Sequence, residues 1–421
     1  MKHPLMRHVA AFMLSVVLAL GFLLLGACLP QQPIDANVLA SAEAMVEDGS
    51  YPLMADKSFA SMLDVTTDAL ILAESKATTI RHPETILTNP RFDGRSDTVS
   101  DLLAYASDDT MQPTGYYVQY WMGFRPVIRL LLCFLDYYQI LRYTAVAFFL
   151  LFAAVMCSLA KRAGTGAAFL FALSIIFVRP HVIAVSLQFS CCFLIAFAAM
   201  LLVPKIHKNR KWESLFFLEL GIVTQYFDFY TTPIVTFGLP MLYLYLLGCR
   251  EQDAPGGKRI GTNVAAWLAG YGLMWLAKLA LTSLLTDANG LGQGLSAFAG
   301  RVGIEKTPGM ESYYNPLAAI RAVFVSLYSD REGKLILFAA VAIAFVLLAY
   351  RFLKDRHTLR EAAKHWQLVF IAALPVIWFM LSAQPTVNHH WFQYRGIAVS
   401  FWAALLWLQF LLQRKPDPLA E

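Results

Sequence analysis

Long runs of apolar residues recur along the chain and predict helices that cross a membrane. Each run is roughly 20 residues long, which is the length that an α-helix needs to span the hydrocarbon core of a bilayer. The runs cover about 9–29, 141–160, 165–179, 182–203, 214–232, 233–249, 260–285, 334–353, 366–382 and 396–413. This pattern predicts an all-α, polytopic membrane bundle of about ten transmembrane helices.

The polar stretch between the first two runs, residues 30–140, is expected to form a large loop with short helices of its own. Pro126–Gln139 is typical of a helix that lies in the membrane interface. The aromatic cluster Tyr116–Trp121 is expected where the chain returns to the bilayer surface. Amphipathic spacing predicts three further helices, at about 36–48, 58–76 and 97–107.

The distribution of Lys and Arg predicts the orientation of the chain. Basic connections alternate with short loops that hold almost no Lys or Arg. Cytoplasmic loops carry the excess of basic residues, so both termini are expected in the cytoplasm. The expected organisation is a first transmembrane helix (a signal anchor) at 1–29, an outer loop at 30–140, a nine-helix bundle at 141–413 with an outer loop at 286–333, and a cytoplasmic tail at 414–421.

The first apolar run has a second interpretation. Leu25–Cys28 resembles a bacterial lipoprotein processing site, and the whole segment has the composition of a signal peptide. The sequence leaves open whether Cys28 carries a lipid. We favour an uncleaved first helix, because the alternation of basic loops requires it.

Composition agrees with a membrane protein and excludes other classes. Hydrophobic residues make up 58% of the chain and charged residues 15%, with a net charge of +5. In a polytopic membrane protein this basic balance reports orientation, so no nucleic-acid partner is expected. The six cysteines lie in or beside apolar runs and are expected to be small buried side chains, not a disulfide or metal framework.

The predicted topology gathers the unusual polar residues on the outer side of the membrane. Few of them fall in the middle of a span, which argues against an ion or proton relay. The arrangement favours chemistry on a lipid head group at the outer surface. The residues are Asp64, Asp68, Asp93, Asp97, Asp101, Arg125, Arg129, Arg179, His181, Asp228, Lys278, Arg301, Glu305, Lys306, His389, His390 and Arg395.

Two carboxylates in the polar stretch are candidate catalytic residues. Asp64 and Asp68 are four residues apart, so a helix over 58–76 stacks them on one polar face. Like charges at this spacing repel each other unless a cation, a proton or a substrate lies between them. The alternative is an ordinary solvated face of a surface helix.

Further acidic and basic candidates also have structural alternatives. Lys278 either holds a phosphate or extends to the interface. Asp228 is either a site residue or a turn residue. Asp93 and Asp97 repeat the four-residue spacing, and Asp97 is equally compatible with a helix N-cap.

Two loops complete the candidates. The outer turn 388–395 combines His389, His390 and Arg395 with three aromatic residues, which is dense for a plain connection. Gly290–Gly294 lacks the strand and helix of a phosphate-binding loop, so a flexible outer segment is expected there.

These stretches and the helix arrangement together resemble the membrane glycosyltransferases of the GT-C superfamily, through a group of GT-C-like bacterial integral membrane proteins. The resemblance covers most of the chain, although its motifs are short. It rests on a first helix followed by a large acidic outer loop, and on the stretches Leu63–Asp68, Tyr120–Arg125 with Arg129, Asp228–Pro233, Gly270–Lys278 and Asn388–Arg395.

The resemblance implies transfer of a sugar from a polyprenyl-phosphate-linked donor to an envelope glycan, lipid or protein acceptor, on the outer face of the bacterial cell membrane. It implies an outer-loop carboxylate as catalytic residue, which matches Asp64 or Asp68. Such transfer needs a base for the acceptor hydroxyl and cations for the departing phosphate. The cation candidates are Arg125, Arg129, Lys278 and Arg395.

Two questions stay open. The Asp-x-Asp or Glu-x-Asp pattern of several GT-C families is absent, so a requirement for a divalent cation is undecided. The alternative function is a flippase, a transporter or a polymerase-like factor for lipid-linked polysaccharide. A transporter is expected to show broken helices, polar residues at the midplane and internal repeats, and the sequence shows no convincing repeat.

Overall fold

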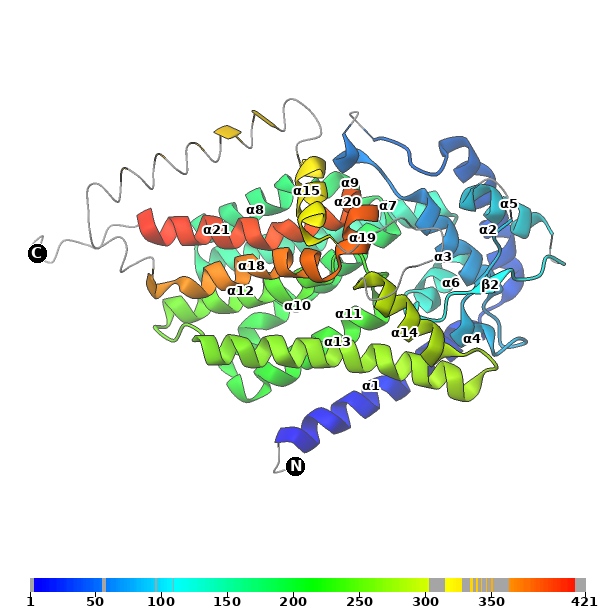
Figure 1. The fold of residues 1–421 in the computed structure, drawn as a ribbon, viewed down its shortest axis with the longest axis horizontal. Helices are drawn as coiled ribbons and strands as arrows, with labels where there is room; N and C mark the ends of the chain where they lie inside the picture. The colour runs from blue at the N-terminus through cyan, green and yellow to red at the C-terminus, as the bar shows by residue number, and fades with distance from the viewer. Residues whose placement is uncertain are drawn as a thin grey trace, which may run out of the picture.

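The computed structural model is a helical bundle, elongated along one axis, with a smaller helical region packed against one end (Figure 1). It describes residues 4–54, 58–94, 97–108, 110–302, 315–327 and 363–412, together with scattered positions between 334 and 350. The apolar run expected at 334–353 and the tail at 414–421 lie mainly or wholly outside the described residues. Glu305 and Lys306 lie outside them as well.

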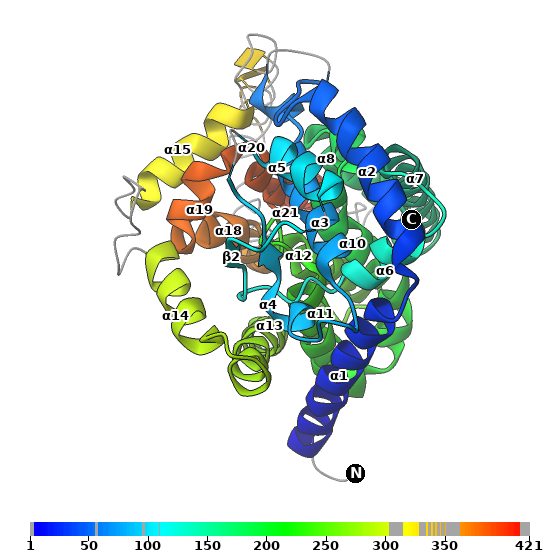
Figure 2. The same cartoon turned by 90° about the vertical axis from the view of Figure 1, so that its right-hand side faces the viewer.

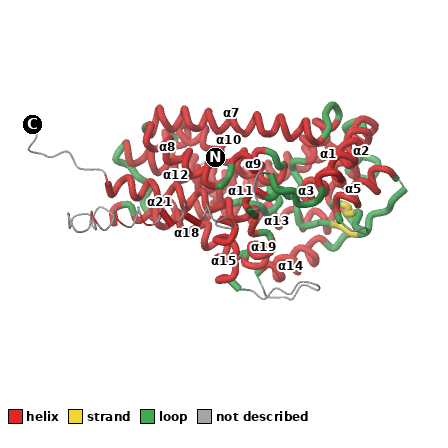
Figure 3. The backbone as a smooth tube through the Cα atoms, turned by 90° about the horizontal axis from the view of Figure 1, so that it is seen from above, coloured by secondary structure: helices red, strands yellow, loops and turns green. Residues whose placement is uncertain are grey.

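The described residues confirm an all-α bundle with helices suited to a membrane. Five helices are long and apolar enough to cross one: Leu5–Ala27, Tyr137–Ala163, Leu187–Lys208, Gly257–Leu285 and His390–Leu412. The long axes of the bundle helices run side by side (Figure 3). The bundle consists of α1 (Pro4–Ala27), α7 (Tyr137–Ala163), α8 (Thr165–Phe177), α10 (Leu187–Lys208), α11 (Glu213–Phe227), α12 (Ile234–Arg250), α13 (Gly257–Leu285), α18 (Trp366–Leu381) and α21 (Ile397–Leu412).

Close packing between α11 and α13 depends on two glycines. A Cβ atom added at Gly221 would collide with the carbonyl oxygen of Trp267, and one at Gly270 would collide with that of Leu218. Helices that approach this closely need residues without side chains at the crossing point, as is common between membrane helices.

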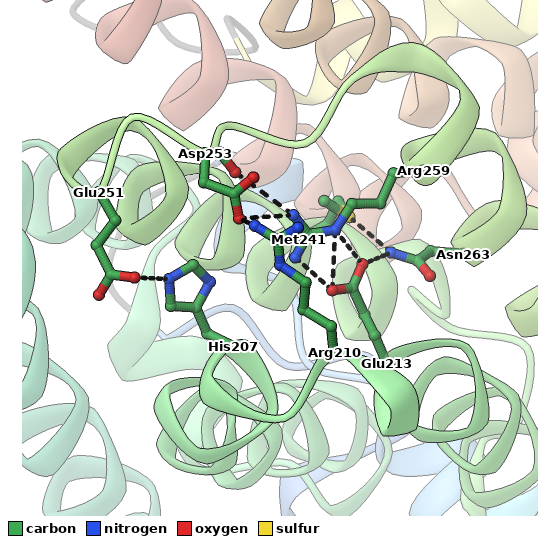
Figure 4. A network of polar contacts seen from close by, with 8 residues as sticks. All are labelled: His207, Arg210, Glu213, Met241, Glu251, Asp253, Arg259 and Asn263. Atoms are coloured by element: carbon green, nitrogen blue, oxygen red, sulfur yellow. Dashed lines mark hydrogen bonds and ion pairs between the residues drawn. The ribbon is translucent and has the colours of Figure 1, made fainter.

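A network of charged residues ties together the connections at one end of the bundle (Figure 4). His207 near the end of α10 contacts Glu251 through a 2.9 Å hydrogen bond. The buried carboxylate of Glu213 accepts hydrogen bonds from Arg259 at 2.9 Å and from Asn263 at 2.6 Å. The network therefore fixes the α10–α11 connection against the connection between α12 and α13.

Both described ends of the chain lie at this same end of the bundle. At the start of α1, His8 forms a 3.1 Å hydrogen bond with Ser214, close to the network. The end of α21 lies at the left of Figure 1, as does the start of α13. The helix α10 leads from the network to the opposite end, a distance of about 30 Å at 1.5 Å per residue.

The N-terminal region, residues 30–136, packs at that opposite end. Its apolar core includes Ile34, Val38, Leu72 and Leu102. Two short antiparallel strands pair Pro90 with Tyr116. The elements are α2 (Gln31–Asp48), η1 (Phe59–Ser61), α3 (Val65–Ala77), α4 (Thr85–Thr88), β1 (Pro90–Arg91), α5 (Thr98–Ser107), β2 (Gly115–Tyr116) and α6 (Arg125–Leu132).

Three helices of this region differ from the prediction at their boundaries. The helix expected at 36–48 is α2, which begins earlier, at Gln31. The expected helix at 58–76 begins only at Val65, because the side chain of Asp64 accepts a hydrogen bond from the backbone N–H of Thr67 and caps the helix. The expected interfacial helix at 126–139 is α6, which ends at Leu132. Asp136 then starts α7 with a capping box, so the second half of the segment belongs to the bundle.

The glycine-rich segment is also different from the prediction. Residues 290–294 form the first turns of a helix, α14 (Gly290–Arg301), and not a flexible loop. Asn289 caps this helix by accepting from the N–H of Gly292 at 2.9 Å. The small residues allow close approach to α13, since a Cβ at Gly290 or Gly294 would collide with Leu279.

Candidate functional site

A polar cavity of about 390 Å³ lies where the N-terminal region meets the bundle. Figure 2 faces this end of the molecule, with α3, α14, α19 (Ala383–Asn388) and α20 (His390–Gln393) in view. Aromatic, amide and charged side chains share the lining. They include Tyr51, Asp64, Arg91, Tyr117, Tyr120, Gln188, Phe229, Tyr230, Arg301, Gln384, Asn388 and His389.

Asp64 is the carboxylate that lines this cavity. Its position before the first turn of α3 is fixed by the 2.9 Å hydrogen bond from the N–H of Thr67. The residue is only 3% exposed. Burial raises the pKa of Asp64 to about 6, although the hydrogen bonds from Thr67 favour the charged form. A carboxylate with this pKa is mostly ionised at neutral pH and is a stronger base than an exposed aspartate.

Asp68 lies behind the cavity and does not line it. Its carboxylate accepts hydrogen bonds from the phenol of Tyr137 at 2.8 Å and from the N–H groups of Leu187 and Gln188 at 3.2 Å each. Burial raises its pKa to about 7, and the charge of Asp64 adds to the increase. The solvated-face alternative is therefore wrong for both carboxylates, and their contacts give them different roles.

Arg301 provides a cation on the far wall of the cavity. Its guanidinium donates a 2.6 Å hydrogen bond to the hydroxyl of Tyr120 and lies over the ring of Tyr230, 4.8 Å from the centroid. The ring of Tyr120 stacks on Phe229 with centroids 4.7 Å apart. Aromatic rings thus hold the cation in place while neutral hydroxyls surround it.

Arg91 is the second cation of the cavity. It extends from β1, lies 5.5 Å from the ring centroid of Tyr117 and pairs with Asp93 at 2.8 Å. Because Asp93 is half exposed, the pair is accessible to solvent and contributes little to stability. Asp93 itself does not line the cavity.

The two neighbouring histidines have separate surroundings. His389 lines the cavity and stacks on Phe392, with centroids 5.2 Å apart. Burial, together with the charge of Arg301 and the neighbouring His390, lowers the pKa of His389 to about 4, so the ring is neutral at physiological pH. His390 points elsewhere, because its Nδ1 shares a 2.7 Å hydrogen bond with Ser326.

A second, apolar cavity of about 240 Å³ adjoins the polar one. Gln188 and Phe229 line both, so the two cavities meet at these side chains. The apolar cavity lies between α6, α7 and α10. Its lining consists of Ile71, Phe124, Val127, Ile128, Leu131, Thr144, Leu187, Ser190, Cys191, Leu194, Ile195 and Phe227 besides the two shared residues.

Arg125 and Arg129, expected to hold a phosphate, lie behind the cavity, where they bind the backbone. Both are completely buried. Arg125 donates to Thr78 at 2.8 Å and to the carbonyl of Ile86 at 2.7 Å. Arg129 donates to the carbonyl of Gly26 at 2.9 Å, at the end of α1. Neither lines the polar cavity.

Lys278 and Arg395, the other expected phosphate ligands, are also fully buried. Lys278 donates to the carbonyl of Leu87 and, at 3.0 Å, to the hydroxyl of Thr282, so it does not extend to the interface. Arg395 donates to the carbonyl of Ala60 at 3.2 Å. None of the four candidates for a phosphate-binding cation therefore lines the polar cavity.

Asp97 and Asp228 have the local roles that were their structural alternatives. Asp97 caps α5 by accepting from the N–H of Val99 at 3.0 Å. Asp228 accepts from the N–H and the hydroxyl of Thr231, at 3.0 and 2.6 Å, and so closes the turn before α12. Neither residue lines the polar cavity.

Several cavity residues were not singled out from the sequence as site residues. Tyr120 belongs to a cluster that was expected to anchor the chain at the interface, but it is 5% exposed and faces the cavity. Arg301 was among the polar residues predicted on the outer side, and Arg91 flanks Asp93, but neither was assigned a role. No local signal separates them from the buried arginines, because the distinction depends on contacts between distant elements.

The six cysteines are free. They were expected to be buried, but only Cys192 is, and Cys28 and Cys157 are exposed. Within the residues that the structure describes, no group of three or more His, Cys, Asp or Glu side chains is arranged to hold a metal ion. No protein-family model, curated protein or solved structure matches the chain.

Proposed function

We propose that this protein is a membrane glycosyltransferase that moves a sugar from a polyprenyl-phosphate-linked donor to an envelope glycan, lipid or protein acceptor. The observation that carries the proposal is the meeting of a polar and an apolar cavity at Gln188 and Phe229. A lipid-linked sugar has the same division into a polar head and an apolar chain. A water-soluble nucleotide sugar has no apolar chain that could occupy the apolar cavity.

The apolar cavity suits the first isoprene units of the donor. It borders α6 and the turn that follows it. There the side chains of Val127, Leu130 and Phe134 are 41%, 50% and 77% exposed. Exposed apolar side chains of this size beside membrane-crossing helices are typical of a surface that faces lipid. A polyprenyl chain in the bilayer would reach the cavity along this surface.

The polar cavity suits the sugar and its phosphate. Aromatic rings such as Tyr117 and Phe229 present apolar faces to a sugar, while Gln384 and Asn388 offer amide groups to its hydroxyls. Arg301 and Arg91 are the cations within the lining, and a guanidinium can donate two parallel hydrogen bonds to a phosphate.

The proposed reaction uses Asp64 as general base. Asp64 takes the proton of the acceptor hydroxyl while the acceptor oxygen forms a bond to the anomeric carbon of the sugar. The bond between that carbon and the phosphate oxygen breaks, and the electron pair leaves with the lipid phosphate. Arg301 stabilises the negative charge that develops on this leaving group.

The same proposal includes the orientation. The described basic connections, at 161–162, 205–211 and 250–259, lie at the end of the bundle that holds the network around Glu213. Arg250 there donates to the carbonyl of Arg162 at 2.9 Å. The positive-inside rule assigns that end to the cytoplasm. The polar cavity would then face the outer side of a bacterial cell membrane, in a bundle of ten transmembrane helices.

Substitution of Asp64 separates a transferase from a flippase. Asp64→Asn keeps the helix cap, because asparagine caps as well as aspartate. It removes the base, so transfer from a polyprenyl-phosphate sugar should fall by about two orders of magnitude or more. The matched control is Asp287→Asn, an exposed carboxylate outside the polar cavity. Transfer at the wild-type rate by purified Asp64→Asn protein would end the proposal, and unchanged lipid translocation without any transfer would favour the flippase.

A further inference from the structure

A short segment, residues 85–91, reaches the polar cavity at one end and borders a second cavity at the other. We call it the strap; it consists of α4, Asn89 and β1. Arg91 at its end lines the polar cavity. Ile86 and Leu87 at its start line a crevice of about 640 Å³ against α1 and the end of α13. The position of Arg91 in the site thus depends on how the strap is held.

Two completely buried cations bind the backbone of the strap from behind. Arg125 donates to the carbonyls of Thr85 at 3.3 Å and of Ile86 at 2.7 Å. Lys278 donates to the carbonyl of Leu87. Three successive carbonyl groups therefore accept from charged donors, and such hydrogen bonds are roughly twice as strong as neutral ones.

Asn89 connects the strap to the aromatic wall of the cavity. Its backbone has a positive φ of 52°, a conformation that asparagine tolerates better than most residues. Its buried side-chain amide donates to the carbonyls of Tyr117 and Tyr120, at 2.8 Å each. A displacement of the strap would therefore move these two rings as well as Arg91.

Glu74 provides the countercharge for the two cations. It is 1% exposed, and neither carboxylate oxygen has a hydrogen-bond partner among the described residues. The nearby charges that favour its ionised form belong to Arg125, Lys278 and Arg91. Removing one partner from a buried charge cluster costs more than removing both, because an uncompensated buried charge remains.

We propose that Glu74, Arg125 and Lys278 are positioning residues, which act on the site by holding the strap and thereby Arg91, Tyr117 and Tyr120. This role rests on the proposed function for its catalytic consequence, whereas the holding of the strap does not depend on any substrate. The cluster would then explain why cations from α6 and α13 converge behind the cavity and not inside it.

Hydrogen exchange followed by mass spectrometry tests the strap in the full-length protein in detergent micelles. The amide groups of Ile86 and Leu87 are hydrogen-bonded at 3.2 and 3.1 Å and should exchange slowly in the wild type. In Lys278→Met, peptides that cover the strap and residues 115–121 should exchange on the order of 10- to 100-fold faster, the factor expected when a buried carbonyl loses its charged donor. Peptides from α7 are the internal reference.

Two further variants keep the result interpretable. Glu74→Gln should also loosen the strap. Glu74→Gln with Lys278→Met should accelerate exchange by less than the product of the two single effects, because both substitutions act on the same coupled cluster. Lys278→Arg, which keeps the charge, should restore most of the protection. Unchanged exchange of the strap in both single variants would overturn the proposal, as would an equal increase in the strap and in α7.

A kinetic measurement separates this proposal from the function. In Lys278→Met, the KM for the polyprenyl-phosphate sugar should rise about tenfold while kcat changes less, since Arg91 is displaced but Asp64 is not. An unchanged KM with a loosened strap would refute the positioning role. Absence of transfer in the wild type would refute the proposed function alone, and the exchange pattern would still decide how the strap is held.

Discussion

The carboxylate of Asp68 accepts a hydrogen bond from the backbone N–H of Gln188, 3.2 Å away, at the first turn of α10. Gln188 is one of the two residues at which the polar and apolar cavities meet. A carboxylate at a helix N-terminus is stabilised by the unpaired N–H groups there. Asp68 therefore fixes the backbone of the residue at which the two cavities meet, although it does not line the polar cavity.

Tyr137→Phe tests this buried junction. The variant removes the 2.8 Å hydrogen bond from the phenol to Asp68 and leaves the ring in place. Hydrogen bonds to charged groups contribute about 1.5 to 3 kcal/mol, so we expect a loss of unfolding free energy of that size. Thermal unfolding of the purified protein measures it. Tyr143→Phe, on the exposed face of the same helix, serves as the control for tyrosine substitution.

The pH dependence of stability should reflect three buried carboxyl groups. Burial raises the pKa values of Asp64, Asp68 and Glu74 to about 6, 7 and 7. In the unfolded chain these groups lose their protons near pH 4. Between pH 4 and 7 the folded protein then binds more protons than the unfolded chain, so the unfolding free energy falls as pH rises.

The unfolding temperature should accordingly be higher at pH 5 than at pH 7.5. Asp68→Asn should show a flatter profile, because one of the titrating groups is gone. A wild-type profile that rises between pH 5 and pH 7 would contradict the buried, proton-binding carboxyls.

Glycine substitutions on α13 test the close packing of the bundle. Gly270→Ala introduces a Cβ against the backbone of Leu218, whereas a Cβ at Gly272 on the same helix meets nothing within 4 Å. We expect Gly270→Ala to lose about 1 to 3 kcal/mol through overpacking. Gly272→Ala should be neutral or gain up to about 1 kcal/mol from helix propensity. Equal unfolding temperatures for the two variants would argue against the close approach of α11 and α13.

The sequence predicted the elements of the fold better than the position of its charges. Hydrophobic runs located the bundle helices to within a few residues, because length and apolarity alone define such helices. The predicted boundaries were wrong where a side chain caps a helix. The helix expected at 58–76 begins only after its cap Asp64, and the cap Asp136 places Tyr137 in α7. Such a cap depends on a few local hydrogen bonds, which the spacing of apolar residues does not reveal.

The candidate site could be predicted only in part. Asp64 and His389 line the cavity, as hypothesised for site residues. Four basic residues, Arg125, Arg129, Lys278 and Arg395, were expected there and instead bind backbone carbonyls. A buried arginine that binds backbone and one that faces a cavity have the same local sequence. Their separation depends on which distant segments pack beside them.

A pH profile of transfer tests the role of Asp64. A general base works only when deprotonated, and the pKa of Asp64 lies at about 6. The kcat/KM for transfer should therefore rise about tenfold per pH unit below pH 6 and level off above it. The residual activity of Asp64→Asn should lack this inflection. A wild-type rate that does not change between pH 5 and pH 7.5 would assign proton removal to another group.

Arg301 offers the sharpest test of phosphate recognition, because it lines the polar cavity at the end of α14. Its guanidinium is held by Tyr120 and Tyr230 without a carboxylate in those contacts, so its charge is available to an anion. Arg301→Gln should lower kcat/KM about 100-fold, the cost of removing one charged hydrogen-bonding partner of about 3 kcal/mol. The kcat/KM of Arg301→Lys should lie between those of the wild type and Arg301→Gln, since lysine keeps the charge but loses the planar contact. The control is Arg321→Gln on the exposed face of α15 (Pro316–Leu327). Inorganic pyrophosphate should compete with the donor in the wild type and not in Arg301→Gln, and equal inhibition of both proteins would remove Arg301 from the phosphate site.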